Sequence, residues 1–136
     1  MSNSSLDDLG KLVLRLTVGI LLLLHGIAKL RYGIDGIEGM LAGKGLPAFF
    51  AWGVYVGEVV APVLLILGFY TRLGAWFAVI NMVVAFLMVH MGQLGQISNS
   101  GGWQLEIQGF FLFASLAIAL MGAGRFSLGG AGGRWN

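Results

Sequence analysis

Six titratable side chains interrupt the long apolar stretches of this sequence. They are Arg15, His25, Lys29, Glu58, His90 and Glu106. Histidine and glutamate exchange protons with a bound molecule, and a lysine ammonium donates hydrogen bonds to it. The chain has no cysteine, which excludes disulfides, thiolate metal sites and dithiol redox chemistry. Redox chemistry on this chain therefore requires a bound redox molecule.

The composition predicts the kind of element that carries these residues. Of the 136 residues, 57% are apolar and only 10% are charged, whereas soluble domains are about a quarter charged. The formal net charge is +2, and no segment concentrates Lys and Arg, which argues against a nucleic-acid partner. We expect an all-α integral membrane protein with a single domain over residues 1–136, whose main partner is the lipid bilayer.

Four apolar runs are long enough to cross about 30 Å of hydrocarbon. They cover residues 12–30, 48–68, 73–92 and 104–122. The short connection between the second and third runs forces an antiparallel hairpin. In the link 31–47, apolar residues recur at spacings of 3 and 4, which predicts a short amphipathic turn at the membrane interface. The expected fold is an antiparallel up-and-down four-helix bundle with that turn between spans one and two.

The basic residues predict the orientation. Five would lie on the side of the termini and three on the other side, namely Lys11, Arg15, Arg72, Arg125 and Arg134 against Lys29, Arg31 and Lys44. This bias predicts cytoplasmic termini. The first residues lack the basic start and small-residue cleavage site of a signal peptide, so we expect the first helix to be retained.

Depth along the helices places most of the titratable groups in one layer. At about 1.5 Å per residue, the outer half of the bundle receives His25, Lys29, Glu58, His90 and Glu106, whereas Arg15 lies near the inner boundary. A charge at membrane depth costs at least ~2.5 kcal/mol and faces the bundle interior or a partner. We predict that His25 and Glu58 are buried within reach of each other or of one ligand, with Lys29 or Arg15 compensating the charge.

Other roles for the same residues stay open. His90 and Glu106 lie near helix ends, where they can reach interfacial water, and Lys29 can extend to the interface along its stem. Arg15 can act as an anchor or as a clamp between helices. Asn81, in the middle of the third span, is expected to form a hydrogen bond between helices. A metal site is not predicted, because no histidine or carboxylate pair shows ligand spacing within one helix, although His25 and His90 can be imagined as axial haem ligands.

Small residues predict how the helices meet. Gly53, Gly57 and Ala61 are four residues apart on the second span, and Gly19 and Gly26 are seven apart on the first. Such strips allow close approach of two backbones. We expect spans one and two to pack tightly and to hold His25 and Glu58 near each other.

Four stretches of the chain carry a resemblance to a known family. They are LRLTVGILLLLHGIAKL (14–30), GLP (45–47), GEVVAPVLLILGFYTRLGA (57–75) and the region from Glu106 to GAGRFSLGG (106–130). The sequence resembles the DoxX family of small four-helix bacterial and archaeal membrane proteins. Members usually carry an aspartate after the closing GxGRxSL element, where this chain has Gly129.

The resemblance implies a location, a system and a set of polar positions. The location is the bacterial or archaeal cytoplasmic (inner) membrane, and the system is a quinone-linked membrane oxidoreductase with partner subunits. The family-like polar positions are Arg15, His25, Lys29, Glu58, Thr71, Arg72 and Glu106.

Two functions follow as hypotheses. In the first, the outer half of the bundle binds a quinone-type hydrophobic small molecule, with walls from Trp52, Tyr55, Phe110 and Phe113 and polar contacts from His25, Lys29, Glu58 and Glu106; such a molecule needs an apolar slot and groups that donate to its carbonyls. In the second, the chain is a non-catalytic accessory or assembly subunit whose buried charges are structural. Four helices are few for a pore, which would require a homo-oligomer.

Overall fold

The computed structural model describes residues 2–136, without the side chains of residues 89 and 90, and this part of the chain is helical with no strand. Its long helices are α1 (Asn3–Tyr32), α5 (Thr71–Ala85) and α6 (Glu106–Met121). The shorter elements are α2 (Asp35–Gly43), η1 (Ala48–Trp52), α3 (Gly53–Tyr55), η2 (Val56–Val60), α4 (Ala61–Leu67), η3 (Phe86–His90) and η4 (Met91–Gln93). The expected all-α class is confirmed.

Helix α1 begins well before the apolar run predicted at residue 12. The Ser2 side chain accepts a hydrogen bond from the Ser5 amide at 3.2 Å and caps the first turn, as serine does at helix N-termini. The helix ends at Tyr32 and is followed by Gly33, whose φ of 83° is in the left-handed region that glycine adopts without strain. Its first two turns are therefore helical without being apolar, which hydropathy alone does not detect.

The second span is one rod built from four elements. η1, α3, η2 and α4 run without interruption over Ala48–Leu67. η1 is a 3₁₀ turn and η2 a π-helical turn. The rod ends at Leu67 and is followed by Gly68, where φ is 71°. Helix α5 starts three residues after Gly68, which makes the predicted antiparallel hairpin.

The described residues contain three helical segments that are long and apolar enough to cross a membrane, Asn3–Tyr32, Ala48–Leu67 and Thr71–Met88. The predicted fourth span corresponds to α6, which has 16 residues and reaches about 24 Å. It starts at Glu106 because the preceding loop turns back. The Trp103 indole donates to the Leu94 carbonyl at 2.8 Å and its ring stacks on Phe86.

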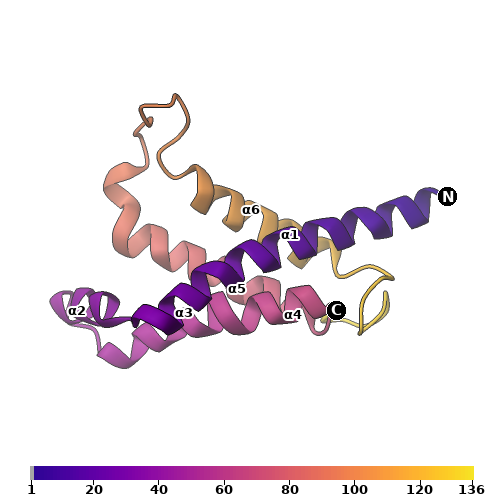
Figure 1. Cartoon of the computed structure of the whole chain (residues 1–136), viewed down its shortest axis with the longest axis horizontal. Helices are drawn as coiled ribbons and strands as arrows, with labels where there is room; N and C mark the ends of the chain where they lie inside the picture. Colours follow the sequence, from indigo (N-terminus) through magenta and orange to yellow (C-terminus); the bar gives the residue numbers. More distant parts are fainter. Residues whose placement is uncertain (1) are drawn as a thin grey trace.

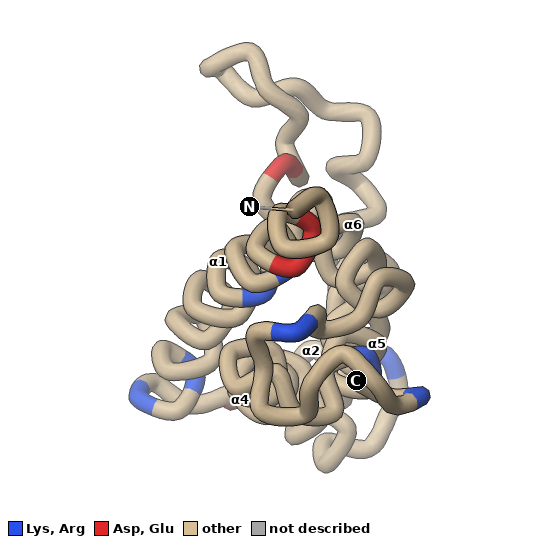
Figure 2. Tube along the Cα trace, turned by 90° about the vertical axis from the view of Figure 1, so that its right-hand side faces the viewer, with Lys and Arg blue, Asp and Glu red and all other residues tan. Residues whose placement is uncertain are grey.

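The helices are arranged so that both termini and the 68–70 turn lie at one end and α2 lies at the other (Figure 1). Charged residues occupy only a few short segments of the trace (Figure 2). The main core joins α1, α4, α5 and α6 through Val18, Leu22, Ala61, Leu65, Ala75, Ala78, Met82, Phe111, Ile118 and Ala119.

A second, smaller cluster lies at the α2 end. The link predicted as an amphipathic turn forms α2, whose Leu41 packs with Ile34 and with Ala51 of η1. The space between the two clusters contains the candidate site.

Candidate functional site

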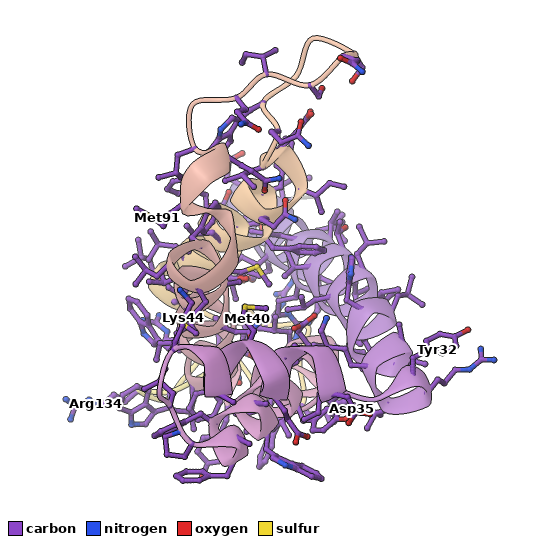
Figure 3. All side chains as sticks on the ribbon, turned by 90° about the vertical axis from the view of Figure 1, so that its left-hand side faces the viewer. Tyr32, Asp35, Met40, Lys44, Met91 and Arg134 are labelled. Carbon is purple, nitrogen blue, oxygen red and sulfur yellow. The ribbon has the colours of Figure 1, made fainter. Side chains whose placement is uncertain are left out.

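A cavity of about 560 Å³ lies between α2 with η1 on one side and α1, α5 and α6 on the other. Its walls are mainly aliphatic and methionine side chains, among them Leu22, Ile37, Met40, Met82 and Met88. Met40 is on the side of α2 that faces the other helices (Figure 3). The polar lining side chains are His25, Lys29, Glu58, Asn81 and Gln108. The cavity therefore suits a molecule that is largely apolar with a small polar group.

The polar part of the cavity is organised around Glu58. Its carboxylate accepts a hydrogen bond from Lys29 Nζ at 2.8 Å on Oε1 and from Asn81 Nδ2 at 3.3 Å on Oε2. Glu58 is 6% exposed, so the pair lies where an uncompensated charge is costly. Lys29, and not Arg15, compensates the charge of Glu58.

Two glycines make this arrangement sterically possible. A Cβ on Gly26 of α1 would fall on the carbonyl oxygen of Glu58, and a Cβ on Gly57 would fall on the side chain of Asn81. A Cβ on Gly19 would lie 2.7 Å from Ile66 Cγ1. The expected close approach of spans one and two therefore rests on Gly19 and Gly26, whereas Gly57 admits α5.

His25 lies on the wall of the same cavity, but it is not buried as predicted. The residue is exposed because its ring borders the open space of the cavity. Its imidazole meets the ring of Phe111 edge to face, with centroids 5.6 Å apart. Among the described side chains, His25 forms no hydrogen bond with Glu58, so the two line one cavity without being bonded to each other.

Two of the predicted site residues are elsewhere. Glu106 is exposed and its carboxylate lies beside Gly102 in the preceding loop, outside the cavity lining. Arg15 is fourteen residues before Lys29 on the same helix, about 21 Å along its axis. The side chain of His90 lies outside the described residues. Among the described residues, no group of three or more His, Cys, Asp or Glu side chains is placed to hold a metal ion.

The aromatic walls also differ from those expected. Phe50 and Phe111 line the cavity, whereas Trp52, Tyr55, Phe110 and Phe113 do not. Phe110 and Phe113 are on the outer face of α6, 72% and 63% exposed, because one residue along a helix turns the side chain by about 100°. The Tyr55 hydroxyl instead donates to the Lys29 carbonyl at 3.3 Å.

Sequence reasoning missed two polar residues of the cavity. Asn81 forms the predicted hydrogen bond between helices, but its place in the cavity was not expected. Gln108 was not singled out at all. It lies two residues after Glu106 at the start of α6, and the signal that favours it is its position three residues before the inward-facing Phe111, on the same helix face.

Comparison with known proteins decides the family. The family model described as DoxX matches residues 10–91, more than half of the chain. The chain belongs to the DoxX family. The matched region includes Lys29, Glu58 and Asn81 and stops before α6.

Two curated proteins are similar to this DoxX chain. A Bacillus subtilis (strain 168) protein with the name "Putative oxidoreductase CatD" is 27% identical over 116 residues, 85% of this chain and 81% of that protein. A Haemophilus influenzae (strain Rd) protein with the name "Uncharacterized protein" is 31% identical over 119 residues, 85% of this chain and 84% of that protein. No solved structure matches the chain.

Arg15 has a different task in this DoxX chain. It is 1% exposed and donates to the Leu65 carbonyl at 3.3 Å and to the Phe126 carbonyl at 2.7 Å. Arg72 similarly donates to the Met121 carbonyl at 3.3 Å. Both arginines meet carbonyls near the C-terminal ends of α4 and α6, where the helix dipole favours a positive charge. They stabilise the end of the bundle that lies opposite the cavity.

The donor set at the cavity determines its chemistry. A lysine ammonium has three donors, and one of those on Lys29 goes to Glu58, so two remain to bind a ligand oxygen. Asn81 and Gln108 add amide groups, and His25 adds a ring nitrogen that donates or accepts. The cavity therefore offers hydrogen bonds to a carbonyl oxygen next to a carboxylate that accepts protons, within an apolar wall.

Proposed function

We propose that this DoxX-family membrane protein binds a quinone-type molecule in the cavity between α2 and the bundle, as a component of a quinone-linked oxidoreductase system in the cytoplasmic membrane. The observation that carries the proposal is an apolar cavity of about 560 Å³ whose polar side chains include the Lys29–Glu58 pair. A quinone matches such a cavity, because it combines an apolar body with carbonyl oxygens that accept hydrogen bonds. The name of the Bacillus subtilis relative, "Putative oxidoreductase CatD", supports the redox part.

Each group of cavity residues has its own role in this proposal. Lys29 and Asn81 donate to a carbonyl oxygen, and the aliphatic and methionine walls hold the apolar body. Reduction of a quinone to a quinol takes two electrons and two protons. In this proposal Glu58 and His25 exchange the protons with the quinone, and a partner subunit supplies or accepts the electrons.

A short-chain quinone titrated into the purified protein tests this proposal. Quenching of the intrinsic fluorescence of the four tryptophans is expected to saturate, and bound ligand should raise the melting temperature. Glu58→Gln and His25→Ala should weaken binding. Glu106→Gln is the matched control, because Glu106 is an exposed carboxylate outside the cavity.

The second candidate function is an accessory or assembly subunit. The observation that favours it is that Lys29 and Glu58 already satisfy each other and join α1 to η2, which is a structural role in itself. If quenching stays linear in quinone concentration and equal in all three variants, quinone binding is excluded and the accessory function is the one that remains.

A further inference from the structure

A second concavity, of about 290 Å³, lies at the end of the bundle that carries the termini, between the turn after α4 and the C-terminal segment. It is lined by Phe69, Tyr70, Arg134 and Trp135, with glycines 129, 132 and 133 and Asn136 completing the wall. No acidic residue is among them. The non-glycine Tyr70 has a φ of 49°, a left-handed conformation that is uncommon outside glycine.

The C-terminal segment is anchored at both of its ends. Its last two residues accept hydrogen bonds, the Trp135 carbonyl from the Arg72 amide at 2.8 Å and Asn136 Oδ1 from the Thr71 amide at 3.0 Å. The Leu128 amide donates to the Leu67 carbonyl at 3.1 Å and the Gly129 amide to the Gly68 carbonyl at 3.0 Å. None of the backbone amides of residues 131–136 donates a hydrogen bond within the described chain, although the Asn136 side-chain amide donates to the Gly130 carbonyl at 2.7 Å. Gly130 and Gly133 have φ values of 74° and 100°, and left-handed residues in such segments help backbone amides converge on an anion.

Arg134 lies in the same segment as these amides, and its side chain has no partner among the described residues. Arg125 pairs with Asp8 at 3.8 Å, and Arg15 and Arg72 donate to carbonyls. Arg134 has no ion pair or hydrogen bond; its guanidinium lies 5.9 Å from the ring centre of Trp135 and its side chain projects away from the bundle (Figure 3). A guanidinium with free donors matches the geometry of a phosphate group.

The aromatic residues indicate where this concavity lies in the bilayer. Phe69, Tyr70 and Trp135 are each about half exposed at the end of two membrane-spanning segments. Tyrosine and tryptophan in this position sit at the level of the lipid headgroups, where phosphates are the abundant acceptors. We propose that Arg134, with the amides of residues 131–136, binds the phosphate of an anionic phospholipid headgroup.

Native mass spectrometry of the full chain in detergent tests this site. Phosphatidylglycerol should remain bound at lower concentration than phosphatidylcholine, and Arg134→Gln should weaken phosphatidylglycerol binding about fivefold, as expected for one basic residue near anionic lipid. Arg31→Gln is the matched control. Arg31 is also exposed and lies 5.5 Å from the ring centre of its neighbour Tyr32, at the opposite end of α1, so its loss should leave the binding unchanged.

Two outcomes would overturn the proposal. Equal weakening in both variants would mean unspecific attraction of the lipid to positive charge. Displacement of the lipid by millimolar inorganic phosphate would identify a soluble anion as the occupant instead. Because this site and the cavity are at opposite ends of the bundle, either result leaves the proposed function untouched.

Discussion

Glu58 is the residue on which the polar part of the cavity depends. It receives hydrogen bonds from α1 through Lys29 and from α5 through Asn81, so three separate helical segments meet at one carboxylate. Such a group is costly to leave unpaired, because the remaining charge lies at membrane depth in largely apolar surroundings.

The effect of removing Glu58 follows from that pairing. Glu58→Ala should lower the free energy of unfolding by about 3–5 kcal/mol, because the Lys29 ammonium loses its counter-charge. Glu58→Gln should cost less, since the amide oxygen still accepts a hydrogen bond. Unfolding in detergent measures both, and Glu106→Ala should change stability by less than about 0.5 kcal/mol. Equal losses for Glu58→Ala and Glu106→Ala would contradict the pairing.

Gly26 is the second residue with a large expected effect. Gly26→Ala places a Cβ on the Glu58 carbonyl, which forces α1 away from η2 and should destabilise the bundle by about 1–3 kcal/mol. Gly10→Ala on the same helix is the control. Nothing lies within 4 Å of a Cβ there, so it should stabilise by about 0.5–1 kcal/mol. Equal changes in stability for Gly26→Ala and Gly10→Ala would contradict the close approach at Gly26.

The sequence predicted the depth of the titratable residues along their helices, but it predicted only in part the direction in which each side chain points around the helix axis. Counting residues placed His25, Lys29 and Glu58 at one level, and the structure has all three on one cavity. The same count included Glu106, whose side chain turns toward its own loop. A rise of 1.5 Å per residue gives depth without helix phase, and phase decides whether a side chain faces the cavity.

At the scale of the elements, the π-helical turn η2 is the feature that periodicity could not predict. Hydrophobic patterns assume 3.6 residues per turn, whereas a π turn shifts the phase of every residue that follows it. Glu58 lies inside this turn, and Gly57 and Glu58 are both buried. The 3₁₀ turn η1 also departs from 3.6 residues per turn, and it contains both Phe50, which lines the cavity, and Trp52, which does not.

Arg15 links α1 to the C-terminal segment, and a substitution can test that link. Arg15→Gln should leave the Leu65 and Phe126 carbonyls short of a donor and loosen the segment that follows α6. Hydrogen exchange at the Leu128 and Gly129 amides, which pair with Leu67 and Gly68, should then become faster.

Arg134→Gln is the control for that measurement, because the Arg134 side chain makes no hydrogen bond to the described residues. Unchanged protection at Leu128 and Gly129 in Arg15→Gln would show that the backbone bonds alone hold the segment. Faster exchange in both variants would point to a general effect of charge.

The whole molecule has two unlike ends. At one end, Arg15 and Arg72 close the bundle against the C-terminal segment, and the main core is packed beside them. At the other, α2 and η1 form a separate small cluster and leave the cavity between themselves and the bundle. Which end faces the cytoplasm therefore decides from which leaflet a hydrophobic molecule enters.

The distribution of basic residues predicts that the end with the termini faces the cytoplasm, because five basic residues lie on that side and three on the other. Because the chain has no cysteine, Asn99→Cys in the loop before α6 and Ala131→Cys in the C-terminal segment each create a unique thiol. A membrane-impermeant thiol reagent on intact cells should label Asn99→Cys, and should label Ala131→Cys only after lysis. The reverse pattern would place the Lys29–Glu58 cavity in the cytoplasmic leaflet, where protons for quinone reduction would come from the cytoplasm.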